Sequence, residues 1–253
     1  MLNNTAKYKY KISAPYTSPR EVIKKEDGFL AYWFTAQLAN WTVRFTCRFL
    51  PTLTPNWFTA GSLILGLVTA VLFAFGDYRS LIFGVLILHI SFMFDCCDGQ
   101  LARIKGIKIR AGAWFDYHSD KIKDGFILLG LAWGVYQQTG QAWILAVAFL
   151  GIFFQFFRNI NALNRDIFSL ETAGTKDRPR TLITTNQKQN QLLRTIKHST
   201  LFKLSDRVLL YTVFGIAAWP IGGIILYTAL AFFFSSASAY LNYREFTKFD
   251  KNK

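Results

Sequence analysis

Residues 95–120 read DCCDGQLARIKGIKIRAGAWFDYHSD and place acids at helical spacing inside an otherwise apolar chain. The four acids of this stretch are Asp95, Asp98, Asp116 and Asp120. Carboxylates at membrane depth are costly to desolvate, and they usually have a function there. The stretch therefore predicts a helical membrane protein whose functional site is built from these acids.

The composition is that of a polytopic membrane protein. The chain has 253 residues, 52% of them hydrophobic, and its mean hydropathy is +0.22. Uncharged runs of about 18 residues or more favour bilayer spans over the alternative, a soluble helical protein with a large core. Such runs are Trp57–Gly76, Gly125–Phe157 and Val208–Tyr243. The last two are too long for one span, and breaks at 137–141 and 219–223 divide them.

We therefore predict an all-α polytopic membrane protein with six transmembrane helices. The spans lie near 57–76, 80–103, 112–136, 142–163, 205–219 and 221–243. An amphipathic juxtamembrane helix is predicted before them, over residues 29–50, because Trp41, Phe45 and Phe49 share one face. Such a helix lies along the membrane surface or packs, solvated, on the rest of the protein. The polar residues 166–204 are predicted to form a cytoplasmic loop, either irregular or partly helical.

The distribution of charge predicts the orientation. The net charge is +14, and basic residues gather at 103–110, at 165–203 and after residue 243, while the opposite turns carry almost none. The positive-inside bias then places both termini and all four acids on the cytoplasmic side of a cytoplasmic (inner) membrane, and we prefer it to a nucleic-acid partner. The predicted segments are a polar arm with the amphipathic helix (1–50), the membrane domain (51–245) and a basic tail (246–253).

Helical geometry predicts that the acids face one another. Residues three or four apart share a helix face. The two resulting stripes consist of Asp95, Asp98 and Ala102 on the second predicted span and of Gly112, Asp116 and Asp120 on the third. Converging carboxylates repel one another unless cations neutralise them, and oxygen ligands favour Mg2+, Mn2+ or Ca2+ over zinc. Two such ions, about 4 Å apart, would clamp a diphosphate during an in-line displacement.

Three further residues of the stretch suit phosphate binding. Gly99 and Gly112 lack side chains, so a base or a phosphate could approach the backbone there. Taken singly, such glycines more often pack helices together. Arg103 lies at the predicted cytoplasmic end, where it could hold phosphate or simply anchor the helix at the membrane surface.

The pattern D-x2-D-G-x2-A-R-x8-G-x3-D-x3-D resembles the signature of the CDP-alcohol phosphotransferase (CDP-alcohol phosphatidyltransferase) family, and every fixed position matches. The segment Thr54-Pro55-Asn56-x-x-Thr59 is similar to the one that precedes the first span in that family. The six-span layout is similar too. The amphipathic helix and the residues before it resemble the branch that includes archaeal inositol-phosphate transferases.

The resemblance implies an enzyme of phospholipid biosynthesis, a homodimer that uses two Mg2+ or Mn2+ ions. A hydroxyl of a second alcohol attacks the β-phosphorus of a CDP-alcohol such as CDP-diacylglycerol, CMP leaves, and a phosphodiester forms. The implied metal ligands are Asp95, Asp98, Asp116 and Asp120, the last of which is also the implied general base. The implied CDP-binding residues are Gly99, Ala102, Arg103, Gly112, Asn56 and Thr59.

The acceptor alcohol stays open, and so does the choice of the lipid as donor or acceptor. Candidates for binding a phosphorylated acceptor, unless they are ordinary membrane anchors, are Arg110, Lys123, Arg158 and Arg165. The main alternative function is a cation transporter or channel, because intramembrane acids also line ion pathways. Transporters favour acids near the midplane and repeated halves, and this sequence shows neither. A nonenzymatic scaffold would leave the four acids unexplained.

Overall fold

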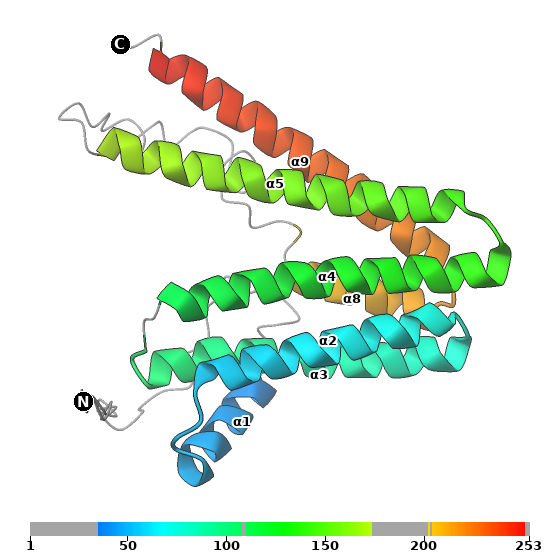
Figure 1. Ribbon diagram of the computed structural model, residues 1–253, viewed down its shortest axis with the longest axis horizontal. Coiled ribbons are helices and arrows are strands. Elements are labelled where there is room, and N and C mark those ends of the chain that lie inside the picture. Colours follow the sequence, from blue (N-terminus) through cyan, green and yellow to red (C-terminus); the bar gives the residue numbers. More distant parts are fainter. Residues whose placement is uncertain (1–34, 108–109, 174–201, 203, 251–253) are drawn as a thin grey trace, which may run out of the picture. The chain divides into compact units, whose positions relative to one another are not determined.

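The computed structural model describes residues 35–107, 110–173, 202 and 204–250. These residues form helices and turns, with no strand among them, so the predicted all-α class is confirmed. The helices of the described ranges, shown in Figure 1, are α1 (Ala36–Phe49), α2 (Pro55–Phe75), α3 (Tyr78–Ile104), α4 (Arg110–Thr139), α5 (Trp143–Ala173), α8 (Leu204–Ile216) and α9 (Pro220–Asp250). The predicted polar arm, residues 1–28, lies outside the described residues.

Each of the six predicted spans coincides with a helix, but only part of the predicted span count is supported. The helices of the described residues that are long and apolar enough to cross a membrane are α2, α3, α5 over Trp143–Arg165 and α9 over Pro220–Thr247. The helix α8 has 13 residues, about 20 Å at the rise of an α-helix, and a bilayer core is about 30 Å thick. In α4 the acids and lysines interrupt the apolar run. The chain is an integral membrane protein with several apolar spans.

Two helices continue beyond the predicted ends of their spans. The helix α5 runs to Ala173, so residues 166–173 of the predicted loop are its last turns, while 174–201 lie outside the described residues. The helix α9 runs to Asp250 and includes the first residues of the predicted tail. Neither extension contains Pro or Gly, so nothing local ends the helix where the apolar run ends.

The helix α1 is amphipathic, as predicted, although residues 29–34 of the predicted helix lie outside the described residues. Its buried face packs Ala39 and Val43 against Cys97 and Leu101 of α3. Its other face exposes the predicted aromatic stripe, with Trp41 77% exposed. An exposed aromatic stripe on a helix beside membrane spans suits the membrane interface, so the surface orientation stays our prediction.

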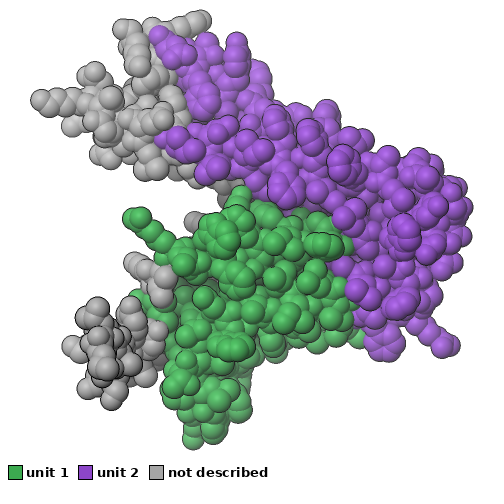
Figure 2. Space-filling view, in the orientation of Figure 1, with its two compact units in different colours: residues 1–69, 86–126 green, residues 70–85, 127–253 purple. Residues whose placement is uncertain are grey.

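The chain divides into two compact units, coloured separately in Figure 2. Unit 1 consists of residues 1–69 and 86–126, and unit 2 consists of residues 70–85 and 127–253. The helices α2, α3 and α4 each begin in one unit and end in the other. All four acids of the motif belong to unit 1.

Within unit 2, two glycines let the last turns of α2 approach α4. Gly130 and Gly134 form a G-x-x-x-G pair on α4. A Cβ atom on Gly130 would overlap the carbonyl oxygen of Ala70, and one on Gly134 would overlap that of Phe73. Small residues at this spacing allow membrane helices to meet backbone to backbone. These glycines therefore set the spacing of α2 and α4 in this unit.

The helices α5 and α9 also pack together in unit 2. The hydroxyl of Thr228 donates a 3.0 Å hydrogen bond to the carbonyl of Val147, and Nδ2 of Asn242 donates one of 2.7 Å to the carbonyl of Asn161. Side-chain hydrogen bonds between membrane helices are typically worth about 1 kcal/mol each. Packing, together with a few such bonds, thus holds these two helices.

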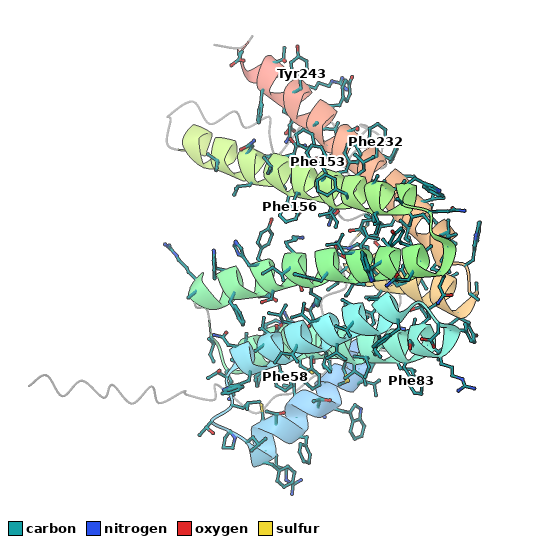
Figure 3. All side chains as sticks on the ribbon, turned by 45° about the vertical axis from the view of Figure 1, so that its right-hand side comes forward. Phe58, Phe83, Phe153, Phe156, Phe232 and Tyr243 are labelled. Atoms are coloured by element: carbon teal, nitrogen blue, oxygen red, sulfur yellow. The ribbon has the colours of Figure 1, made fainter. Side chains whose placement is uncertain are left out.

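Large aromatic side chains cover the outer faces of these helices. Phe153 and Phe156 of α5 and Phe232 and Tyr243 of α9, labelled in Figure 3, are each more than half exposed. Patches of this kind would be a liability in water, whereas a bilayer covers them. They agree with the assignment of α5 and α9 as membrane-spanning helices.

We predict that Gly130→Ala lowers the thermal stability of the detergent-purified protein, because the added methyl group meets a backbone carbonyl that cannot move aside. Overpacking of this kind costs about 1–3 kcal/mol. The matched control is Gly125→Ala on the same helix, where a Cβ has nothing within 4 Å. That control should be neutral or slightly stabilising, since Ala favours a helix. Equal melting temperatures for the two variants would contradict the proposed close packing.

Candidate active site

Three carboxylates from two helices meet at one point of unit 1. Asp95 and Asp98 come from α3 and Asp116 comes from α4, and one oxygen of each lies within 4.8 Å of the other two. The three-residue interval between Asp95 and Asp98 places both on one face of α3. The structure therefore brings together three of the four acids that the motif contributes.

Asp120 lies beside this group and is paired with a lysine. Its Oδ1 is 3.0 Å from Nζ of Lys123, which is also 2.8 Å from Oδ1 of Asp95. Lys123 is only 2% exposed. From the sequence we predicted that Lys123 binds the acceptor, but the structure turns its ammonium group into the acid cluster. This geometry does not favour the acceptor role.

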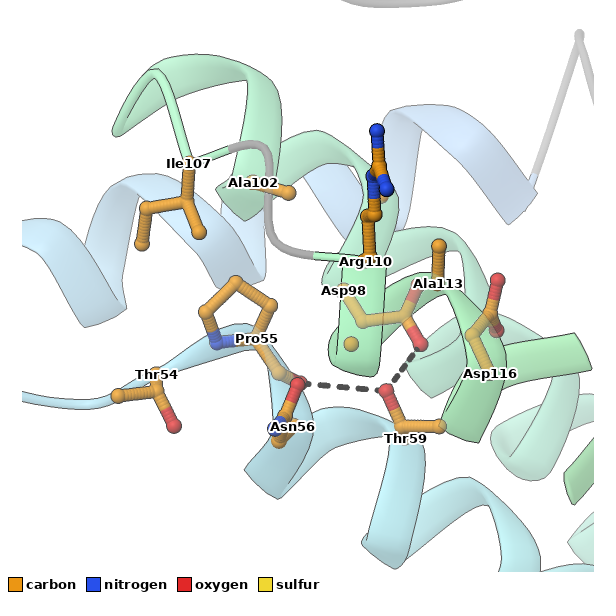
Figure 4. Close-up of a pocket in the computed structure, with 12 residues that line it drawn as sticks. Thr54, Pro55, Asn56, Thr59, Asp98, Ala102, Ile107, Arg110, Ala113 and Asp116 are labelled. Atoms are coloured by element: carbon orange, nitrogen blue, oxygen red, sulfur yellow. Dashed lines mark hydrogen bonds between the residues drawn. The ribbon is translucent and has the colours of Figure 1, made fainter.

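Hydroxyl groups of α2 orient two of the acids. Thr59 donates a 2.7 Å hydrogen bond to Oδ2 of Asp98, as Figure 4 shows. Ser62 lies 3.5 Å from Oδ1 of Asp95 and is buried beside Ser91 of α3, whose hydroxyl donates to the carbonyl of Ser62 at 2.8 Å. Thr59 was predicted as a CDP-binding residue, and what this structure shows is its hydrogen bond to a carboxylate of the acid group.

A cavity of about 500 Å³ opens beside the acids, a volume typical of small-molecule sites. Asp98 and Asp116 form part of its wall. It is also lined by five of the six predicted CDP-binding residues, Asn56, Thr59, Gly99, Ala102 and Gly112. The lining residues that we did not predict for this role are Thr54, Pro55, Ile107, Arg110 and Ala113. Thr54 and Pro55 belong to the Thr54–Thr59 segment that resembles the family. Ile107 and Ala113 are apolar residues outside the fixed positions of the motif, so the sequence did not point to them.

The two motif glycines keep this cavity open. A Cβ on Gly112 would stand 3.2 Å from Oδ1 of Asn56, and one on Gly99 would stand 3.3 Å from Nη1 of Arg103. Both are tighter than ordinary van der Waals contacts. Arg103, the sixth predicted CDP-binding residue, is thus beside Gly99 but is not among the residues that line the cavity.

Lys105 holds the chain that leads into the cavity wall. Its Nζ donates to the carbonyls of Pro51 at 2.7 Å and of Leu53 at 2.5 Å. This fastens the turn before Thr54 and Pro55 to the end of α3. From the sequence we assigned Lys105 only to the positive-inside bias, because nothing in a sequence separates a basic residue that anchors a loop from one that faces the lipid surface.

The donor set fits a divalent cation. Three carboxylate oxygens at mutual distances below 4.8 Å are hard ligands of the kind that Mg2+ and Mn2+ prefer, and no cysteine or histidine belongs to the group. A cation between them would also offset their mutual repulsion. The predicted choice of Mg2+ or Mn2+ over zinc agrees with this donor set.

The predicted acceptor-binding residues fall in different places. Arg110 lines the cavity of unit 1. Arg158 and Arg165 belong to α5 and unit 2, where the guanidinium of Arg158 donates to the carbonyl of Phe202 at 3.2 and 3.3 Å. Of these residues, the structure brings Arg110 alone to the cavity and Lys123 to the acids.

Comparisons with known proteins agree with this fold. Two solved structures of Mycobacterium tuberculosis phosphatidylinositol phosphate synthase (PgsA1) share the fold. The one with CDP-DAG bound has a TM-score of 0.58 and 18% identity and covers 83% of this chain and 94% of its own. The one in complex with manganese and citrate has a TM-score of 0.56 and 17% identity, with coverages of 83% and 89%. No curated protein sequence matches.

The family model described as CDP-alcohol phosphatidyltransferase matches residues 52–235. That range holds the complete acid motif, the Thr54–Thr59 segment and every residue of the cavity wall. It also holds most of the membrane domain that we predicted from the sequence. The chain therefore belongs to the CDP-alcohol phosphatidyltransferase family, the transferases of phospholipid biosynthesis that its acid motif resembles.

Proposed function

We propose that this enzyme transfers a substituted phosphate group from CDP-diacylglycerol to the hydroxyl of a second alcohol and releases CMP. The observation that carries the proposal is the cavity of about 500 Å³, whose wall includes two acids of the carboxylate group. A structural neighbour of this chain has been solved with CDP-DAG bound, which supports CDP-diacylglycerol as the donor. The alternative considered from the sequence was a cation transporter or channel. The family assignment supports a transferase instead.

We propose that Asp95, Asp98 and Asp116 hold a divalent cation, Mg2+ or Mn2+, and that Asp120 completes a site for a second. A neighbour solved in complex with manganese supports this choice of metal. When bound, the metal supplies positive charge that polarises the diphosphate and stabilises the leaving CMP. The residues of the chain orient these ligands: Thr59 through its bond to Asp98, and Lys123 through its pairs with Asp95 and Asp120.

We assign the proton transfer to Asp120. The acceptor oxygen forms a bond to the β-phosphorus, the bond from that phosphorus to the oxygen shared with the α-phosphorus breaks, and CMP departs with the electron pair. The acceptor proton passes to a carboxylate oxygen of Asp120, as expected of a general base that lies beside the metal ligands. Gly99 and Gly112 leave room for the cytidine and its diphosphate, with Asn56 and Ala102 beside them.

For the acceptor we propose an alcohol that carries a phosphate, because Arg110 is one of the residues that line the cavity and arginine is well suited to bind phosphate. The fold is shared with a phosphatidylinositol phosphate synthase, which agrees with this choice. Arg158 and Arg165 remain predictions for the same role. We further propose a homodimer in the cytoplasmic membrane, with the acids and both termini on the cytoplasmic side, as the charge distribution predicts.

We predict that purified protein with Mn2+ and CDP-diacylglycerol releases CMP with one acceptor among glycerol 3-phosphate, serine, inositol and inositol 1-phosphate. Asp120→Asn, the blank, should lose about 10²- to 10⁴-fold in rate, the usual contribution of a general base, while it still folds in detergent. Near-normal CMP release by Asp120→Asn would contradict the assignment of the base. Release with serine or inositol alone would overturn the phosphorylated acceptor.

We predict that EDTA abolishes CMP release and that Mg2+ or Mn2+ restores it, whereas Zn2+ does not. The physical reason is the all-carboxylate donor set, which selects hard cations. The control is Asp116→Asn, which removes a ligand and should require a higher Mn2+ concentration for any remaining turnover. Undiminished CMP release in EDTA would rule out a metal-dependent reaction.

We predict that Lys105→Met raises the KM for CDP-diacylglycerol by about 3- to 10-fold and changes kcat less. Hydrogen bonds from a charged donor are worth about 1.5–3 kcal/mol, and part of that loss should loosen the cavity wall. Lys105→Arg, which keeps the charge and the donors, is the control and should lie closer to wild type. A KM for the donor equal to that of wild type would show that this clamp does not shape the donor site.

A further inference from the structure

Lys123 lies inside the acid cluster, although the motif ends at Asp120 and assigns it nothing. Its side chain is almost completely buried, at 3% exposure, and its ammonium lies 2.8 Å from Asp95 and 3.0 Å from Asp120. Buried lysines are rare unless they are paired. A lysine in this position brings a positive charge among groups that we expect to receive metal ions.

The protein is shaped to receive this side chain. Gly66 of α2 faces the stem of Lys123, and a Cβ on Gly66 would overlap the Cγ atom of the lysine. The stem therefore occupies space that any other residue at position 66 would fill. Because only glycine at position 66 leaves room for this stem, Lys123 has a defined position and does not move over a surface.

The ammonium group has partners on three helices. It donates hydrogen bonds to Oδ1 of Asp95 and to the hydroxyl of Ser62, each 2.8 Å away. It also forms an ion pair with Asp120, whose Oδ1 is 3.0 Å away. Ser62 is held in turn by Ser91, whose hydroxyl donates to its carbonyl at 2.8 Å. Three helices, α2, α3 and α4, thus meet at one nitrogen atom within unit 1.

The charge of Lys123 offsets the repulsion between the carboxylates. Four carboxylates close together repel one another, and before metal arrives nothing else among the motif residues carries a compensating charge at their centre. Removing one member of a buried ion pair is strongly destabilising, because the other charge stays buried without compensation. Asp95 and Asp120 also lie on different helices, so one cation that binds both fixes the distance between α3 and α4.

We propose that Lys123 is a positioning residue of this active site, which holds Asp95 and Asp120 in place and balances the acids before the divalent cation binds. The proposal rests on the proposed function in taking the acids as metal ligands. It assigns Lys123 no contact with substrate. Its consequence is that Lys123 and the metal share one task, so each becomes more necessary when the other is missing.

The test compares melting temperatures of detergent-purified protein in EDTA and in saturating Mn2+. Lys123→Met should melt lower than wild type by about 5–10 °C in EDTA, and Mn2+ should close more than half of that gap. A lysine with a purely structural role would give the same gap in both conditions, and that result would overturn the proposal. So would a wild-type melting temperature for Lys123→Met in EDTA.

The matched control is Lys121→Met, two residues away on the same helix. It removes the same charge, but from a half-buried side chain whose Nζ lies 5.1 Å over the ring of Tyr117. Its gap in EDTA should be much smaller than that of Lys123→Met. Equal gaps would show that general charge balance matters and that the position of Lys123 does not, which contradicts the proposal.

A double variant keeps the test decisive if Lys123→Met is too unstable to purify. Asp120→Asn removes one of the two acids that Lys123 balances, so Lys123→Met should cost less in that background than in wild type. Recovery of folded protein in the double variant supports the proposal, and an equal or larger cost overturns it. CMP release by wild type is measured separately: its absence refutes the proposed function, whereas the metal-dependent melting pattern alone decides the role of Lys123.

Discussion

The repulsion between carboxylates that are buried or half-buried is the constraint on which the rest of this site depends. One oxygen each of Asp95, Asp98 and Asp116 lies within 4.8 Å of the other two, and positive charge beside such a group favours its ionised form. The structure supplies part of that charge from Lys123, and hydroxyls of α2 hold the acids in orientation. The contacts of Lys123 also join α2, α3 and α4 in unit 1.

Around the acids, glycines leave space for neighbouring side chains and lysines join separate elements of the chain. Gly66 leaves room for the stem of Lys123, and Gly112 leaves room beside Asn56 at the cavity wall. Lys123 ties α3 to α4, and Lys105 ties the end of α3 to the turn before α2. Both lysines bind groups of the protein itself. The net charge of +14 therefore overstates the number of basic side chains that are available to bind anionic substrates.

The family assignment and the geometry support each other at the level of reaction class. The reaction that we propose needs a site for a CDP-alcohol. The cavity of about 500 Å³ beside the carboxylates has a volume typical of small-molecule sites, which agrees with that proposal. The proposed acceptor class rests on Arg110, one of the residues that line the cavity, and one charge defines a class of ligand but not a single molecule.

The positions of the helices and the facing arrangement of the acids could be predicted from the sequence, because helical periodicity and the length of an apolar run are local properties. The motif spacing was enough to predict that Asp95, Asp98 and Asp116 share facing stripes, and the apolar runs located the helices. The predicted number of spans was less secure, since α4 and α8 lack a long apolar run and depend on their neighbours. The helices α5 and α9 run past the ends of their predicted spans, because hydropathy marks where apolar residues stop and not where a helix stops.

The tertiary structure alone decided what each lysine does. Lys123 and Lys105 are indistinguishable from membrane anchors in the sequence. Asp120 is a local partner of Lys123, three residues away. The other partners, Asp95 and Ser62 of Lys123 and the two carbonyls that Lys105 binds, lie 28 to 61 and 52 to 54 residues away along the chain. A contact over such separations depends on how three helices pack, and one sequence does not encode that packing in any local pattern. The sequence thus determined which chemistry the chain carries, and the packing of helices determined which side chains hold that chemistry in place.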